Sequence, residues 1–265
     1  FFATRARQSC KNSQKLHSRK VVMEKKPLLQ DIGRKMRIKA KGDAHIENPS
    51  LIVANHTSLL DIFAVPYVLS EACQVVMSSR LMWKRDTEEH KARRRLIEQT
   101  LYGIPLEVHG GRDRVEVGLD MAVRAIQDGW SVLVFPEGAY TGEHRVTKGR
   151  TGASRVLLAA RDCGVDVDLL PVGISRDVAM DDLDSLTPND KPIDVTIGAP
   201  IEYETDYEVF KNTNDSTQKR RVLQHVVDIA MRETANLAGL PYVDERISLR
   251  PRHTIVLENG EEIPV

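Results

Sequence analysis

The sequence has little cysteine. Its three cysteines, Cys10, Cys73 and Cys163, are scattered over 265 residues. A disulfide framework in a small domain needs more cysteines than this, and a structural zinc site needs cysteine or histidine ligands at short, regular spacings. Because neither pattern is present, we expect reduced thiols, as in a cytoplasmic protein.

A long apolar run and a net charge are also missing. No stretch of 18 uncharged apolar residues occurs, and the longest candidate, residues 51–69, is interrupted by Asn55, His56 and Asp61. A membrane-spanning helix is therefore not predicted. Lys and Arg together number 38, as do Asp and Glu. This balance gives no reason to expect a nucleic-acid partner.

The charges that are present are unevenly distributed. Residues 1–42 contain thirteen Lys or Arg side chains and two acidic ones, whereas residues 162–215 contain fourteen Asp or Glu side chains. A basic segment is attracted to an anionic lipid surface. We therefore predict a cytoplasmic protein whose residues 1–42 make peripheral contact with the inner face of a membrane. The sequence begins Phe1-Phe2 without a methionine, and we expect it to be a fragment or a processed form.

Strand-like and helix-like segments alternate along the chain. Strands are predicted over residues 51–55, 74–78, 104–108, 131–135, 167–174 and 193–198. Apolar residues recur at helical spacings between them, and a long amphipathic helix is predicted over residues 217–237. The alternation predicts an α/β fold with a largely parallel central sheet flanked by helices. We expect a basic leader over residues 1–30 (disordered or an interfacial helix), the α/β domain over residues 31–243 and a tail over residues 244–265.

A histidine and an aspartate follow the first of these predicted strands. His56 comes directly after the apolar run Leu51-Ile52-Val53-Ala54 and one asparagine, and Asp61 lies five residues further on. A carboxylate that fixes the tautomer of an imidazole and stabilises its cation makes the imidazole an effective general base. Ser58 lies between the two but has no nucleophile-elbow motif around it. The pair therefore predicts acid–base catalysis in which the substrate supplies the attacking hydroxyl.

A second candidate element follows the strand predicted at residues 131–135. Pro136 turns the chain, and Glu137 and Gly138 come next. Gly138 permits a close approach of the backbone to a ligand. Glu137 is a candidate acceptor for a hydrogen bond from a substrate hydroxyl, and the alternative interpretation is a carboxylate that caps or holds a loop.

Cationic side chains lie near both elements in the sequence. Arg112 and Arg114 follow a Gly-Gly turn, and Arg145 and Lys148 follow the Glu137 loop. Arginine and backbone N–H groups at a turn suit an anionic group such as a phosphate. The alternative is that these are solvated side chains with no ligand.

Taken in order, these motifs resemble those of the glycerolipid acyltransferases, and bacterial 1-acylglycerol-3-phosphate acyltransferases in particular. The motifs are Asn-His-x4-Asp at residues 55–61, Gly-Gly-Arg-Asp-Arg at 110–114, Phe-Pro-Glu-Gly at 135–138, Lys-Gly-x3-Ala at 148–153 and Leu-Pro-Val-Gly-Ile at 170–174. The resemblance runs from about residue 35 to residue 243. It implies that the α/β domain predicted for residues 31–243 is an acyltransferase domain.

The resemblance implies a reaction and its partners. His56 would deprotonate the hydroxyl of an acceptor, a lysophospholipid such as lysophosphatidic acid, while Asp61 orients the imidazole. The acyl group would come from the thioester of acyl-CoA or acyl carrier protein in one direct transfer, with no cofactor and no metal ion. Glu137 and Gly138 would help to bind the acceptor.

The sequence departs from the family pattern at two places. His109 stands where the family usually has an arginine, and Ala139-Tyr140 stands where it usually has Thr-Arg. Both changes remove groups associated with an acceptor phosphate. The alternatives are therefore an acceptor without glycerol phosphate (a glycolipid or a specialised metabolite), a thioesterase, and a non-catalytic protein that binds lipid or acyl carrier protein. The intact His56 and Asp61 pair disfavours the last.

Overall fold

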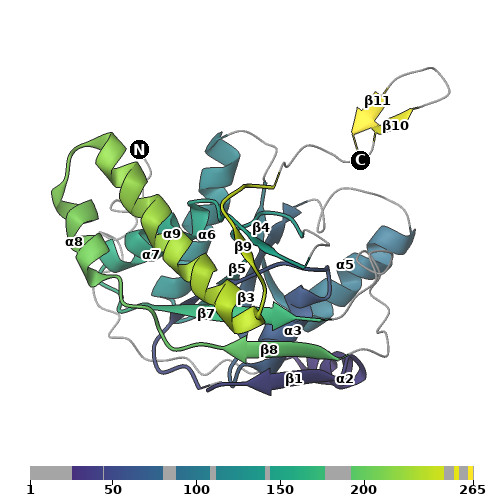
Figure 1. Ribbon diagram of the computed structural model, residues 1–265. Coiled ribbons are helices and arrows are strands. Elements are labelled where there is room, and N and C mark those ends of the chain that lie inside the picture. Colours follow the sequence, from purple (N-terminus) through teal and green to yellow (C-terminus); the bar gives the residue numbers. More distant parts are fainter. Residues whose placement is uncertain are drawn as a thin grey trace.

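A seven-stranded sheet forms the centre of the molecule, with the strand order β1-β8-β7-β2-β5-β3-β4 (Figure 1). The computed structural model describes residues 26–43, 45–79, 88–107, 112–140, 144–176, 192–247, 254–256 and 262–264. The strands of the sheet are β1 (Ile38–Lys41), β2 (Ser50–Ala54), β3 (Cys73–Ser78), β4 (Tyr102–Leu106), β5 (Ser131–Val134), β7 (Asp168–Ser175) and β8 (Ile193–Ile197). All six predicted strands are present, and β1 is an addition at the edge.

The sheet is largely parallel, as the sequence predicts. Strands β7, β2, β5, β3 and β4 pair in parallel, whereas β8 pairs antiparallel with β7 and carries β1 beside it in parallel. Parallel neighbours require crossover connections, which helices provide here. The carboxyl ends of the five parallel strands therefore lie along one edge of the sheet.

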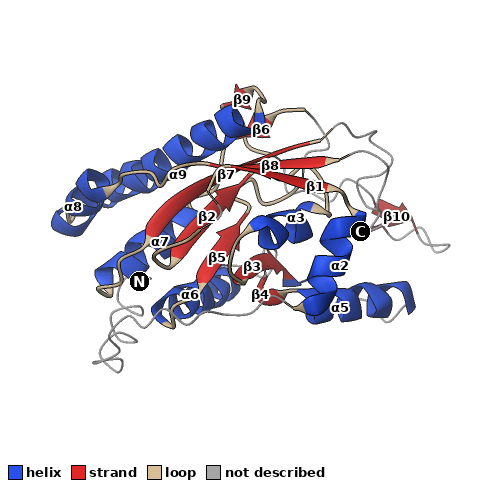
Figure 2. Cartoon of the chain, turned by 90° about the horizontal axis from the view of Figure 1, so that it is seen from below, coloured by secondary structure: helices blue, strands red, loops and turns tan. Residues whose placement is uncertain are grey.

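Helices cover both faces of the sheet. They are α2 (Pro27–Lys35), α3 (Asp61–Val68), α5 (Glu88–Thr100), α6 (Arg112–Gln127), α7 (Gly152–Asp162), α8 (Glu204–Asn212) and α9 (Ser216–Ala238). Helices α6, α7 and α9 pack on one face, and α2, α3 and α5 pack on the other (Figure 2). The fold is thus a three-layer α/β/α sandwich, and the predicted fold class is confirmed.

Strand β2 shows why this sequence lies at the middle of the sandwich. Leu51 and Val53 pack among α6, α7 and α9, whereas Ile52 and Ala54 pack on the opposite face. Alternate side chains of a strand point to opposite faces, so a strand covered on both sides must be apolar throughout. All of β2 is buried, and it pairs with β5 on one side and β7 on the other.

Helix α9 is held firmly against the sheet. Its amino end is capped by the side chain of Asp215, which accepts a hydrogen bond from the Thr217 N–H at 2.8 Å, and it ends at Gly239, whose φ of 65° is left-handed. Near its carboxyl end, the buried hydroxyl of Thr234 donates to the carbonyl of Val53 in β2 at 3.2 Å. The helix therefore supports β2 two residues before the chain leaves the sheet.

The structure describes the predicted leader and tail only in part. Helix α2 begins at Pro27, so it overlaps the end of the leader predicted for residues 1–30. Residues 1–25 lie outside the described residues, and membrane contact by residues 1–42 stays a prediction. Within the described ranges, no helix combines the length and the apolar character needed to cross a bilayer. In the predicted tail, β10 (Thr254–Val256) and β11 (Glu262–Pro264) form an antiparallel pair.

The expectation of reduced thiols is met at Cys73, which lies in β3 and is free and buried. Cys10 lies outside the described residues.

Candidate active site

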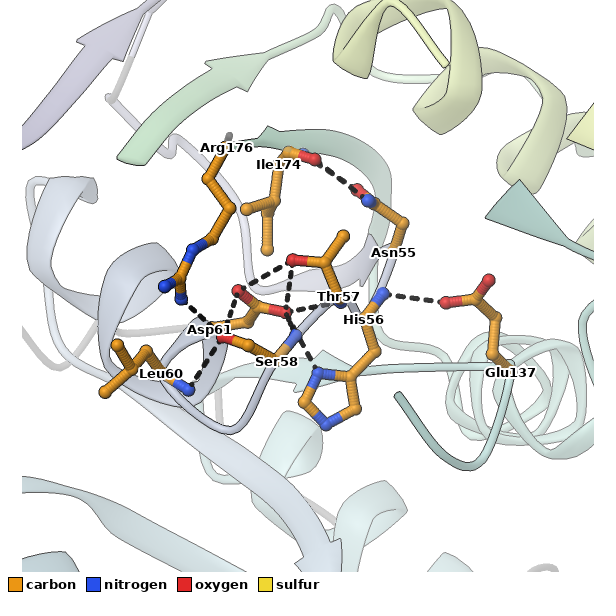
Figure 3. Close-up of polar contacts among 9 residues, drawn as sticks. All are labelled: Asn55, His56, Thr57, Ser58, Leu60, Asp61, Glu137, Ile174 and Arg176. Carbon is orange, nitrogen blue, oxygen red and sulfur yellow. Dashed lines mark hydrogen bonds and ion pairs between the residues drawn. The ribbon is translucent and has the colours of Figure 1, made fainter. Parts of the chain in front are cut away.

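Three adjacent parallel strands deliver polar side chains to the same edge of the sheet. His56 follows β2, Glu137 follows β5, and Arg176 follows β7 directly. Strands β5 and β7 are the two neighbours of β2. The carboxyl edge of a parallel sheet is the usual position of a ligand site in α/β proteins, and the close-up in Figure 3 shows all three residues around the loop that joins β2 to α3.

His56 and Asp61 form a hydrogen-bonded pair. The imidazole Nδ1 lies 3.1 Å from the Asp61 carboxylate Oδ2. Asp61 is the first residue of α3 and is completely buried, whereas 12% of the His56 side chain is exposed. A tight loop of four residues between them turns the helix start back toward the ring, as the spacing predicts.

The Asp61 carboxylate is surrounded by donors from the same loop. Its Oδ2 accepts the backbone N–H groups of Thr57 at 2.6 Å and Ser58 at 2.8 Å. The hydroxyls of both residues also lie within hydrogen-bond distance of the carboxylate. A buried carboxylate is costly unless its oxygens are satisfied. These donors make the burial tolerable and leave Asp61 as an acceptor for the Nδ1–H of His56.

Aromatic side chains enclose the His56 ring. Phe135 stacks on it with the ring centroids 4.3 Å apart and an interplanar angle of 22°. Tyr140 meets it edge-on, at 5.4 Å and 80°. The two contacts limit the rotation of the imidazole. Tyr140 stands at the position where the motif of the glycerolipid acyltransferases usually has an arginine.

Asn55 joins the ends of β2 and β7 immediately before His56. Its side-chain amide donates to the Ile174 carbonyl at 2.9 Å and accepts the Ile174 N–H at 2.7 Å (Figure 3). The side chain thereby replaces a pair of backbone hydrogen bonds where β2 leaves the sheet, and it is completely buried. The backbone that carries His56 is consequently tied to the strand beside it.

The Glu137 carboxylate holds two segments of the protein together. One oxygen accepts the backbone N–H of His56 at 2.7 Å, and the other accepts the backbone N–H of Thr147 at 2.7 Å and its hydroxyl at 3.0 Å. Glu137 is 1% exposed. These contacts support the interpretation of Glu137 as a loop-holding carboxylate, and its contact with an acceptor stays a prediction. Gly138 follows with a left-handed φ of 81°, which favours glycine.

Thr147 belongs to a small sheet that comes from the far end of the chain. Strand β6 (Val146–Thr147) pairs in parallel with β9 (Tyr242–Val243). The backbone N–H of Lys148 extends this pairing by donating to the Glu245 carbonyl at 2.9 Å. The Glu137 carboxylate links the His56 backbone to Thr147 in β6. Strand β9, which follows α9, pairs with β6 and thereby supports this link.

The buried carboxyl of Glu137 is expected to make stability depend on pH. Burial raises its pKa from 4.5 to about 7, while hydrogen bonds from Thr147 and His56 act in the opposite direction. Between pH 4.5 and about pH 7, the Glu137 carboxyl is protonated in the folded state and ionised in the unfolded state. The contribution of Glu137 to the free energy of unfolding is therefore greatest at low pH and falls, by about 3 kcal/mol in total, as the pH rises through the window.

Urea unfolding of the wild type and Glu137→Gln at several values from about pH 5 to about pH 8 tests this dependence. Glutamine does not titrate, so subtracting the variant cancels the other ionisable groups. We expect the stability of the wild type relative to the variant to fall across the window. A difference that stays constant with pH would show that the carboxyl titrates at its ordinary value.

The predicted cationic residues lie in different settings. Arg114 is exposed on α6, and Arg145 is half-buried just before β6. The positive charge of Lys148 is already compensated, since its Nζ lies 2.8 Å from the Asp244 carboxylate and 3.9 Å from the Asp228 carboxylate. The side chain of Arg112 lies outside the described residues, as does His109.

Among the described residues, metal ligands do not gather at this edge. Within the part of the chain that the structure describes, no three His, Cys, Asp or Glu side chains lie close enough to hold a metal ion.

Sequence reasoning missed Arg176. Its side chain is 6% exposed, and its Nη1 donates to the Ser58 hydroxyl at 2.7 Å. In the sequence it is one arginine after the run Leu170–Ser175, and no spacing rule separates it from a solvated side chain. The available signal was its position directly after a predicted strand, at the edge where the other candidate residues lie.

Comparison with known proteins places the chain in a family. The model of the family described as Acyltransferase matches residues 35–175, which is more than half of the chain. The chain belongs to the acyltransferase family. The resemblance to acyltransferases that the ordered motifs indicate is therefore confirmed by the family match.

The structure is similar to the crystal structure of the 1-acyl-sn-glycerophosphate (LPA) acyltransferase PlsC from Thermotoga maritima, with a TM-score of 0.47 and 19% sequence identity, over 78% of this chain and 79% of that one. No curated protein sequence matches the acyltransferase chain.

Proposed function

We propose that this acyltransferase moves a fatty acyl group from an acyl thioester to the hydroxyl of lysophosphatidic acid or a related acceptor, with His56 as the general base. The observation that carries the proposal is the His56 Nδ1 to Asp61 Oδ2 contact of 3.1 Å at the carboxyl edge of the sheet. A carboxylate at Nδ1 favours the tautomer whose lone pair is on Nε2. Figure 3 shows Nε2 on the side of the ring that points away from Asp61.

The reaction needs one base and no enzyme-bound intermediate. His56 Nε2 takes the proton of the acceptor hydroxyl as its oxygen attacks the thioester carbonyl. The carbon–sulfur bond breaks, and the leaving thiolate takes the proton back from the imidazolium. Asp61 stabilises the imidazolium while it exists. The products are an ester and a free thiol, and His56 returns to its neutral form.

The burial and hydrogen bonds of Ser58 support direct transfer rather than an acyl-serine intermediate. Ser58 is completely buried, and its hydroxyl accepts hydrogen bonds from the Leu60 N–H at 3.2 Å and from Arg176 at 2.7 Å. A nucleophilic serine needs an oxygen that is exposed to substrate and has a lone pair free to attack. The Ser58 oxygen is buried and both of its lone pairs accept hydrogen bonds, so the attacking oxygen is assigned to the acceptor.

The phosphate of lysophosphatidic acid would require cationic partners. The candidates from the sequence are Arg112, Arg114, Arg145 and Lys148, and the ion pairs of Lys148 with Asp228 and Asp244 count against it. Tyr140 beside the His56 ring favours a second candidate function, acyl transfer to a hydroxyl acceptor without a phosphate. The two candidates share the chemistry at His56 and differ only in the recognition of the acceptor.

Alanine substitutions separate the two acceptors. If an arginine binds the phosphate, Arg112→Ala, Arg114→Ala or Arg145→Ala should raise the KM for lysophosphatidic acid by roughly 10- to 150-fold, the equivalent of a lost charge-assisted hydrogen bond. The KM for monoacylglycerol, which lacks the phosphate, should not change. Steady-state kinetics with both acceptors measures this.

Arg124→Ala provides the matched control, because Arg124 is an exposed arginine near the other end of α6. It should leave both KM values at the wild-type level. If the wild type uses both acceptors equally well and no arginine variant separates them, the lysophosphatidic acid proposal falls and the uncharged acceptor takes its place.

A further inference from the structure

We propose that Arg176 is a positioning residue for the His56–Asp61 pair and acts on it through the hydroxyl of Ser58. The inference deepens the proposed function and rests on it. Arg176 lies one residue beyond the matched family segment, residues 35–175. It reaches the pair because β7, which it follows, lies beside β2 in the sheet.

The hydrogen bonds of Ser58 explain how the arginine acts. A serine hydroxyl has one proton and two lone pairs, whereas a guanidinium only donates. Arg176 Nη1 and the Leu60 N–H, at 2.7 Å and 3.2 Å, occupy the two lone pairs. The proton then has to point elsewhere, and the Asp61 Oδ1 lies 3.4 Å from the Ser58 oxygen. Arg176 therefore turns the hydroxyl proton toward the carboxylate.

Asp61 holds its orientation through both oxygens. Oδ2 accepts the backbone N–H groups of the loop, lies 3.2 Å from the Thr57 hydroxyl and faces the imidazole. The hydroxyls of Thr57 and Ser58 each lie 3.4 Å from Oδ1. If the Ser58 proton turned away, Oδ1 would keep only the Thr57 hydroxyl and the carboxylate would be held less firmly. A small rotation would misdirect Oδ2 from Nδ1, and misplacement of a catalytic group lowers the rate strongly.

Three variants test the inference. Arg176→Met should lower kcat by about tenfold, the lower end expected for one charge-assisted hydrogen bond, with little change in the acceptor KM. Arg176→Lys retains a charged donor and should keep kcat closer to that of the wild type than Arg176→Met does. Ser58→Ala should lower kcat by a factor similar to that of Arg176→Met.

The double variant and a control separate positioning from packing. If Arg176 acts through Ser58, Arg176→Met combined with Ser58→Ala should lower kcat no further than the larger single effect. Arg155→Met is the matched control, because Arg155 is a largely buried arginine of α7 that pairs with Glu116 on α6. The thermal stability of Arg155→Met should fall while its kcat stays at the wild-type level.

The outcomes distinguish this inference from the proposed function. If His56→Ala, measured in parallel, retains activity, the proposed function fails and the role of Arg176 fails with it. If His56→Ala is inactive but Arg176→Met has the kcat of the wild type, only the inference about Arg176 is overturned. Should Arg176→Met not fold, Ser58→Ala decides the matter, since a wild-type kcat in that variant would contradict the inference.

Discussion

Asp61→Asn is expected to lower kcat on the order of 10³- to 10⁴-fold. An amide cannot stabilise the imidazolium, and its NH₂ group favours the wrong imidazole tautomer. The surrounding donors add to the effect, because the N–H groups of Thr57 and Ser58 at 2.6 Å and 2.8 Å require an acceptor at Oδ2. If the amide presents its oxygen to these donors, the carboxylate charge is still lost. Steady-state kinetics at saturating donor and acceptor measures kcat.

The chain contains its own control for this variant. His225 and Asp206 form a second His–Asp pair, with Nδ1 2.9 Å from Oδ1, on α9 and α8. The His225 side chain is 61% exposed. Neither residue lies directly after a strand of the sheet, because both are inside helices. Asp206→Asn should leave kcat unchanged. A wild-type kcat in Asp61→Asn, or an equal loss in both variants, would contradict the assignment of the catalytic pair.

His56→Ala is expected to lower kcat by about 10²- to 10⁴-fold, the usual cost of removing a general base. The fold should persist, because the main supports of this loop are backbone contacts. The His56 N–H still donates to Glu137 in the variant, and Asp61 keeps its other donors. Circular dichroism and thermal unfolding check the fold, and His225→Ala is the matched control. Activity within a few fold of the wild type would exclude His56 as the base.

Much of the fold could be predicted because the buried strands are strongly apolar. Strand β2 is covered on both faces and reads as an uninterrupted apolar run, and the other predicted strands likewise coincide with observed ones. Strand β1 was missed because its sequence, Ile-Lys-Ala-Lys, is mostly exposed at the edge of the sheet. The antiparallel pairing of β8 with β7 depends on the path between them, which no local pattern reveals.

The contact between His56 and Asp61 could be predicted, but the network around it could not. His56 and Asp61 lie five positions apart and are joined by one short loop, so their contact can be inferred from the local sequence. Glu137 contacts Thr147 and the His56 backbone, and the latter lies 81 positions earlier. Arg176 reaches Ser58 over 118 positions. Such contacts follow from the order of strands in the sheet, and that order becomes visible only in the folded chain.

The measurement that tests the account most directly follows both products of the proposed reaction. Free thiol released from a long-chain acyl-CoA, or from acyl carrier protein loaded with the same acyl group, is recorded with and without lysophosphatidic acid, and the acylated acceptor is quantified by mass spectrometry. We predict that the wild type releases thiol only when the acceptor is present, in equal amount to the ester formed, and that His56→Ala forms neither. Equal thiol release without an acceptor, or undiminished ester formation by His56→Ala, would contradict acyl transfer by His56.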